Sequence, residues 1–315
     1  MNKDNKWIIF LAFAAVYIIW GSTYLAILLG LKGIPPLLLC ALRFIIAGVL
    51  LLGWCLWHGE KFPAQNSIRI NSLCGILMLS GGIGSVSWAE QYISSSLAAV
   101  IVTALPFWFV IFDKKKWSFY FSNKFIIGGL LLGFTGVVLL LGFEKTPQEA
   151  IHKSGNQLAA SLIILAGGIC WSCGSLYSKY RVTGSSILMN GAIQLLIAGI
   201  FSFAISGLAG EWKNFHLKQV GNEAWLALLY LVTMGSIVTF VCYLFLLKVR
   251  PAAQVSTYVY VNPVVALFLG ALIAQERITG TKIIGLLIIL CGVLLVNIPS
   301  YRTVIDGKQV ASGAS

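Results

Sequence analysis

Uncharged stretches of about 20 residues recur along almost the entire chain, and they restrict its fold more than any other feature. A helix of roughly that length crosses the apolar core of a bilayer. Only 10% of the 315 residues are charged, whereas a soluble domain carries roughly a quarter. The mean hydropathy of +0.89 agrees with this. The chain is therefore predicted to be an all-α membrane protein.

The spacing of the charged connections predicts ten transmembrane helices. The first is longer than the apolar core of a signal peptide and is expected to be retained. The ten helices are expected at residues 7–29, 35–57, 71–91, 95–112, 125–143, 157–178, 186–209, 224–246, 252–274 and 281–298.

The basic residues lie singly in short connections, so the net charge of +12 does not predict a nucleic-acid partner. An even number of helices puts both termini on one side of the membrane. With cytoplasmic termini, the inner segments hold 14 Lys and Arg residues and the outer segments 7. Cytoplasmic loops accumulate these residues. Both termini are therefore predicted to be cytoplasmic, in a bacterial inner membrane.

The seven cysteines lie within apolar spans and do not indicate a disulfide framework. Cys170 and Cys173 form a C-x-x-C on a predicted helix, without the further ligands that a metal site needs. We interpret them as small packing residues. The three histidines lie in predicted loops. The sequence thus predicts no metal and no cofactor.

The two halves of the chain resemble each other. Trp20 and an Ile-Ala-Gly triplet recur 151 positions later, the tryptophan as Trp171. Pro106 and an Ile-Ile-Gly triplet recur 157 positions later, the proline as Pro263. The common order and spacing of these matches indicate a repeat.

A repeat of five helices enters the membrane in the opposite direction the second time, because five is odd. Inverted repeats are a recurrent design of secondary transporters, with the substrate site where the repeats meet. We predict the repeats at residues 1–150 and 151–300 and a cytoplasmic tail at 301–315.

Four motifs resemble a known family. They are WGSTY at 20–24, LRFIIAG at 42–48, SSLAAVIVTALP at 95–106 and YVYVNPV at 258–264. Together, over residues 7–298, they resemble the EamA family of the drug/metabolite transporter superfamily. The resemblance implies a basket of five plus five helices with a central cavity, and export of amino acids or related metabolites in several members.

Ionisable groups inside a membrane are costly, and the predicted helices contain two. Arg43 lies about 12 Å into the second helix, at 1.5 Å per residue. Glu90 lies near the outer end of the third helix. Arg43 either anchors helix ends or pairs with Glu90. Glu90 either has no role or holds a substrate ammonium or a proton, so proton coupling stays open.

Polar side chains gather on the ninth helix just before Pro263, and Tyr258 and Asn262 share one face there. Helix–helix hydrogen bonds explain some of them, and a cavity wall explains the rest. Aromatic residues are either cavity lining or packing. The candidates for substrate binding or cavity lining are Trp20, Ser22, Tyr24, Trp88, Glu90, Thr103, Pro106, Trp171, Ser175, Thr257, Tyr258, Asn262 and Pro263.

Gly129 and Gly133 form a G-x-x-x-G in the fifth helix, and Gly285 and Gly292 lie seven apart in the tenth. Small residues let helix backbones approach closely, so these two helices are expected to pack together. The contact could lie within one chain or between two. The protein could thus be a monomer or a homodimer.

The leading interpretation is a transporter that exports a small metabolite across the lipid bilayer. A multidrug or cation exporter is the nearest alternative, but residues 7–29 lack the acidic residue that a resemblance to the small multidrug members of the superfamily would imply. A membrane-embedded enzyme would need paired carboxylates, a histidine cluster or a nucleophile–base pair within the spans. Glu90 is the one acid predicted to be buried, so we do not expect an enzyme.

Overall fold

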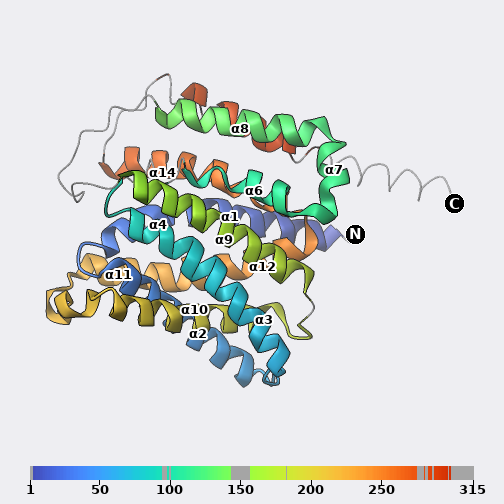
Figure 1. Ribbon diagram of the computed structural model, residues 1–315. Coiled ribbons are helices and arrows are strands. Elements are labelled where there is room, and N and C mark those ends of the chain that lie inside the picture. The colour runs from blue at the N-terminus through green and yellow to red at the C-terminus, as the bar shows by residue number, and fades with distance from the viewer. Residues whose placement is uncertain are drawn as a thin grey trace.

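Long helices lie side by side in the computed structural model and run roughly along one common direction (Figure 1). The structure describes residues 3–93, 98, 101–142, 157–181, 183–274, 280, 283–285, 287–296 and 298. Within these ranges there is no strand, so the all-helical fold class is confirmed.

Nine labelled elements lie in the first half of the chain and nine in the second. Those of the first half are α1 (Lys3–Gly30), α2 (Pro36–Trp57), α3 (Gln65–Gly75), η1 (Ile76–Ile83), α4 (Gly84–Ala89), α6 (Leu105–Phe112), η2 (Lys114–Lys116), α7 (Trp117–Phe121) and α8 (Lys124–Gly142). Those of the second half are α9 (Gln157–Tyr180), α10 (Ile187–Leu208), η3 (Glu211–Asn214), η4 (Leu217–Gln219), α11 (Asn222–Tyr230), η5 (Leu231–Val238), α12 (Thr239–Val249), α13 (Ala252–Val255) and α14 (Tyr258–Ala274).

Six helices of the described residues are long and apolar enough to cross a membrane, three in each half. Several of the ten expected helices extend into residues outside the described ranges, so the count of ten stays a prediction. The six are Lys6–Gly30, Pro36–Trp57, Gln65–Ala89, Gln157–Tyr180, Ile187–Leu208 and Asn222–Val249.

The outward faces of these helices carry large apolar side chains. Leu50 on α2 is 53% exposed and Leu226 on α11 is 66% exposed. A surface this apolar suits lipid rather than water. The fold therefore agrees with a membrane protein.

The connections between helices lie at two opposite ends of the bundle, and polar contacts join them there. At one, which we call the Lys115 end (residues 58–64, 113–116, 181 and 183–186), Lys115 Nζ lies 4.5 Å from the ring centre of Tyr180. There Ser186 Oγ also donates to Glu60 Oε2 at 2.7 Å. At the other, the Lys32 end (residues 31–35 and 209–221), Lys32 forms a 3.1 Å ion pair with Glu223.

The long helices of the second half run opposite to their counterparts in the first half. Helix α1 ends at the Lys32 end, whereas α9, its counterpart in order, ends at the Lys115 end (Figure 1). Helix α2 begins at the Lys32 end, where the amide of Leu38 donates to Glu211 Oε2 at 2.9 Å. Helix α10 begins at the Lys115 end, where Ser186 caps it.

The third long helix of each half contains a π-helical segment, which the sequence analysis did not predict. Segment η1 interrupts the helix from Gln65 to Ala89, and η5 interrupts the helix from Asn222 to Val249. Each segment has eight residues, and the two begin 155 positions apart. Segments of this kind are frequent at functional sites.

The expected helix at 252–274 is not continuous, which corrects its boundaries. It divides into α13 and α14, with a break at Ser256 and Thr257. The Ser256 hydroxyl donates to the Ala253 carbonyl at 2.9 Å, and the Thr257 hydroxyl donates to the Gln254 carbonyl at 2.7 Å. Such local bonds compete with the helical backbone pattern. The expected helix at 71–91 begins earlier, at Gln65.

Helix α8 packs against the segment that contains Ile283–Val296, within one chain. A Cβ added to Gly129 would lie 2.7 Å from the Gly292 carbonyl oxygen, and one added to Gly292 would lie 2.5 Å from the Gly133 backbone nitrogen. Only glycine permits this approach. These glycines therefore let two helices of the same chain pack closely. The sequence had left open whether this contact lies within one chain or between two.

We expect Gly129→Ala to destabilise the protein and Gly128→Ala to leave its stability nearly unchanged. A Cβ at Gly129 meets backbone, whereas one at Gly128 meets nothing within 4 Å. Overpacking of this kind costs about 1–3 kcal/mol. Thermal unfolding of both variants in the same detergent measures the difference. Equal unfolding temperatures would contradict the close packing of α8.

Candidate substrate cavity

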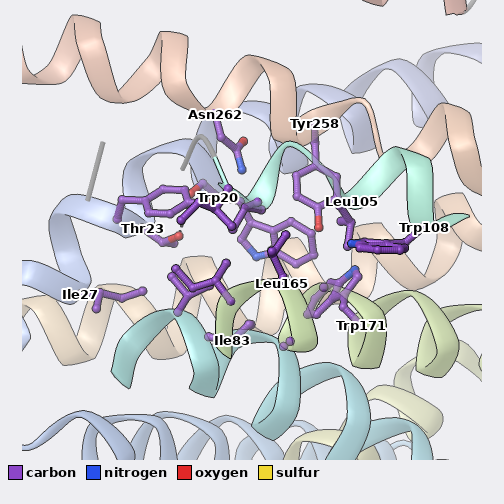
Figure 2. A pocket seen from close by; sticks show the side chains of 18 of the residues that line it. Trp20, Thr23, Ile27, Ile83, Leu105, Trp108, Leu165, Trp171, Tyr258 and Asn262 are labelled. Atoms are coloured by element: carbon purple, nitrogen blue, oxygen red, sulfur yellow. Dashed lines mark hydrogen bonds between the residues drawn. The ribbon is translucent and has the colours of Figure 1, made fainter. Parts of the chain in front are cut away.

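A cavity lies between the two halves of the chain and contains about 710 Å³ of empty space, including the part that opens to the outside (Figure 2). Helices from both halves form its wall. The lining residues are Trp20, Thr23, Tyr24, Ile27, Arg43, Gly82, Ile83, Val86, Ile101, Val102, Leu105, Trp108, Ile164, Leu165, Gly167, Gly168, Trp171, Tyr258 and Asn262.

The cavity lies nearer to the Lys32 end than to the Lys115 end. On α1 its lining begins at Trp20 and reaches Ile27, close to the end of the helix at Gly30. On α9, which runs the other way, the lining covers 164–171 and leaves the last nine residues free of it. On both helices the lining therefore avoids the part nearest the Lys115 end.

Four buried aromatic side chains pack together where the lining on α1 and α9 ends toward the Lys115 end, and we call them the aromatic floor: Trp20, Trp171, Tyr243 and Tyr258. The ring centre of Trp20 lies 5.5 Å from that of Trp171 and 4.8 Å from that of Tyr258. Tyr243 lies 5.1 Å from Trp20. Figure 2 shows Trp20 among Tyr258, Leu165 and Trp171.

Each floor tryptophan contacts the π segment of the other half. The Trp20 Nε1 donates to the carbonyl of Gly235 in η5 at 3.0 Å. A Cβ added to Gly82 in η1 would lie 2.7 Å from Cε3 of Trp171, so this ring lies directly on the glycine. The two contacts are reciprocal. Each half thus holds the tryptophan of the other.

Tyr243 completes the floor and was missed by the sequence analysis. Its hydroxyl accepts from Trp171 Nε1 at 2.9 Å and lies 2.7 Å from Ser175 Oγ. Tyr243 is a polar aromatic residue in an apolar span, the same signal that selected Tyr258. That signal would have found it.

Arg43 lines the cavity and is 2% exposed. Its Nε donates to Ser236 Oγ in η5 at 2.7 Å. A pair with Glu90 was one of two alternatives for Arg43, and it stays a prediction. Glu90, also 2% exposed, lies at the end of α4. The arginine thus bonds the second half of the chain.

Five of the predicted site residues line the cavity: Trp20, Tyr24, Trp171, Tyr258 and Asn262. The structure brings these together from α1, α9 and α14. Whether they bind substrate stays a prediction.

Other predicted residues lie outside the lining. Ser22 Oγ lies 2.5 Å from Tyr230 Oη, and Thr257 Oγ1 lies 2.7 Å from Tyr17 Oη. Ser175 supports the floor through Tyr243. Trp88 packs on Tyr92 with ring centres 4.8 Å apart.

The remaining predicted residues belong to the backbone breaks or the buried surroundings. Pro106 lies in the first turn of α6, and Pro263 lies inside α14. Thr103 is buried just before α6. The apolar residues of the wall, such as Ile27 and Leu165, were not predicted from the sequence, because nothing distinguishes them from the other apolar residues of the same spans.

The Lys115 end is closed by buried polar contacts around Asp113. Its carboxylate accepts from Tyr120 Oη at 2.7 Å and from Tyr180 Oη at 2.5 Å. Burial, and then the bond to Asp113, raise the pKa of Tyr120 above its ordinary value. The hydroxyl therefore stays a donor at physiological pH. This cluster joins α7 to α9, across the two halves.

Comparison with known families decides the class of this chain. Residues 6–142 and 158–298 each match the EamA-like transporter family. The chain belongs to the EamA-like transporter family. The family and the helical fold both indicate a membrane transporter. The family match confirms the resemblance that the four motifs indicated.

Individual proteins are similar to this chain over most of its length. The chain is 35% identical to an inner membrane transporter, YedA, of Escherichia coli strain K12, over 93% of this chain and 92% of the relative. It is 24% identical to a probable amino-acid metabolite efflux pump of the same organism, over 91% and 93%. A chain of known crystal structure shares the fold with a TM-score of 0.73 at 20% identity, over 93% and 97%.

For this EamA-like transporter we expect cysteine at position 262 to react with a small water-soluble thiol reagent faster than cysteine at 257. Asn262 lines the cavity, whereas Thr257 is fully buried against Tyr17 and Gln254. Labelling rates of Asn262→Cys and Thr257→Cys, each in a variant without the native cysteines, test this. Equal rates would mean that the cavity does not admit water at Asn262.

Proposed function

We propose that the protein is a secondary transporter that exports small metabolites such as amino acids by alternating access. The observation that carries this proposal is the cavity between the halves, whose floor is held by reciprocal contacts across them. Because the two halves are similar and contact each other reciprocally, each half can adopt the conformation of the other. The cavity then opens to one side of the membrane and afterwards to the other.

Ten helices in two inverted repeats, residues 1–150 and 151–300, with a tail at 301–315, underlie this mechanism. The opposite directions of α1 and α9 support the inversion. So do the equal lengths and positions of the π segments η1 and η5. The separate family matches of the two halves support the division.

The Lys115 end faces the cytoplasm in this proposal, with both termini on that side of an inner membrane. The bias of basic residues supports this orientation, because cytoplasmic connections accumulate them. The Lys115 end holds Lys61, Lys114, Lys115, Lys116 and Arg181, and the Lys32 end holds Lys32, Lys213 and Lys218. The cavity then lies in the outer half of the membrane, with its inner side closed by the aromatic floor and the Asp113 cluster.

The described lining of the cavity contains a cation, Arg43, and no carboxylate. This argues for export of metabolites over the alternative of a multidrug or cation exporter. A role of Glu90 in binding or in proton coupling, and the choice between monomer and homodimer, stay predictions.

The orientation predicts that Lys213→Cys reacts from outside intact cells with a membrane-impermeant thiol reagent. Lys61→Cys is expected to react only after the cells are permeabilised. Both side chains are exposed at opposite ends of the bundle, so accessibility to the reagent is matched. The reverse pattern would invert the topology.

Transport is tested by counterflow of radiolabelled amino acids in proteoliposomes. Ile27→Trp is expected to abolish it, because Ile27 is 4% exposed and lines the cavity, where the larger ring fills the space. Ile18→Trp is the matched control on the same helix, with a side chain 59% exposed on the outer surface. It should keep counterflow. No counterflow of any amino acid by the wild-type protein would contradict the proposed substrates.

A further inference from the structure

The Arg43 guanidinium is a buried cation with most of its donors unused. Its one hydrogen bond, among the residues that the structure describes, runs from Nε to Ser236 Oγ at 2.7 Å. A guanidinium carries five N–H donors, and four of them are on Nη1 and Nη2. No carboxylate of the described chain lies at ion-pair distance from it. A buried charge without a counter-charge is costly, so the site is incomplete as it stands.

Segment η5 sets the direction of this side chain. Ser236 holds Nε, and Gly235 gives room to the end of the group, because a Cβ there would lie 2.9 Å from Nη2 and 3.1 Å from Thr23 Cγ2. With Nε engaged, the parallel N–H groups of Nη1 and Nη2 form the free edge. That edge matches the two oxygens of a carboxylate.

The rest of the cavity wall is mostly apolar, and polar groups such as the Tyr24 hydroxyl and the Asn262 amide are available to the ammonium of an amino acid. Trp20, Trp108, Trp171 and Tyr258 contribute rings, and aliphatic side chains fill the space between them (Figure 2). Arg43 is the one charged residue of the described lining. A single cation balances a monovalent carboxylate, whereas a phosphate dianion would leave one charge uncompensated in an apolar cavity.

We infer that Arg43 binds the carboxylate of the transported solute and that the aromatic wall binds its apolar side group. The substrate class is therefore monocarboxylates with an apolar or aromatic side group, which includes amino acids of that kind. This inference rests on the proposed function and deepens it. Arg43 is then a substrate-binding residue, and Ser236 and Gly235 are positioning residues.

Ligand binding to the purified full-length protein tests the carboxylate site. The probes are 3-phenylpropionate, L-phenylalanine, L-phenylalaninamide and phenethylamine, which share the ring but differ in the carboxylate. We expect the first two to raise the unfolding temperature and the last two to leave it unchanged. Binding of the amide or the amine as tightly as the acids, or no binding of either acid, would overturn the inference.

Arg43→Gln removes the charge and should weaken binding of both acids by about 30-fold or more. Arg181→Gln, at the Lys115 end and outside the cavity, is the matched control and should bind as the wild type does. Should Arg43→Gln fail to fold, Ser236→Ala keeps the charge and removes the Nε acceptor, and it should weaken the binding of both acids. Acid binding that is unchanged in a folded Arg43 or Ser236 variant contradicts the site.

Counterflow separates this inference from the proposed function. If the acids bind through Arg43 but the protein shows no counterflow, the carboxylate site is supported and the proposed transport is refuted. Counterflow that Arg43→Gln does not reduce would support transport and refute the site.

Discussion

The hydrogen bond from Trp20 Nε1 to the Gly235 carbonyl is the interaction on which the cavity depends. An indole N–H buried in an apolar region needs an acceptor, because leaving it without one costs about 1–3 kcal/mol. Here the acceptor comes from the other half of the chain. Trp171 is held in the reciprocal way, with its ring on Gly82 and its N–H on Tyr243. The floor of the cavity is thus also the joint between the halves.

The two π segments explain why that joint lies where it does. Both occur in the third long helix of their half, and both contain the glycine that meets a tryptophan. Segment η5 also provides Ser236 for Arg43. One irregular turn therefore positions an aromatic ring and a cation at the same cavity. Regular helices would rotate these contacts away from each other, because successive residues turn by a fixed angle.

The buried charges of the protein have distinct environments. Asp113 accepts from two tyrosines and closes the Lys115 end. Arg43 faces a space rather than a partner of opposite charge. Charge in an apolar region persists when hydrogen bonds or a ligand compensate it. Hydrogen bonds within the protein compensate the charge of Asp113. In our proposal, a bound solute compensates the charge of Arg43.

The sequence by itself determined the all-helical membrane fold and the family, since both depend on long uncharged spans and on local motifs such as those around Trp20 and Tyr258. It also singled out six residues that line the cavity, five of them as candidate lining residues and Arg43 as a charge within a span. Only the tertiary structure decided that Arg43 bonds Ser236, that Tyr243 supports the floor and that η1 and η5 are π-helical. These facts depend on which faces of distant helices meet. Apolar periodicity does not encode that choice in a membrane, because lipid-facing and protein-facing side chains are equally apolar.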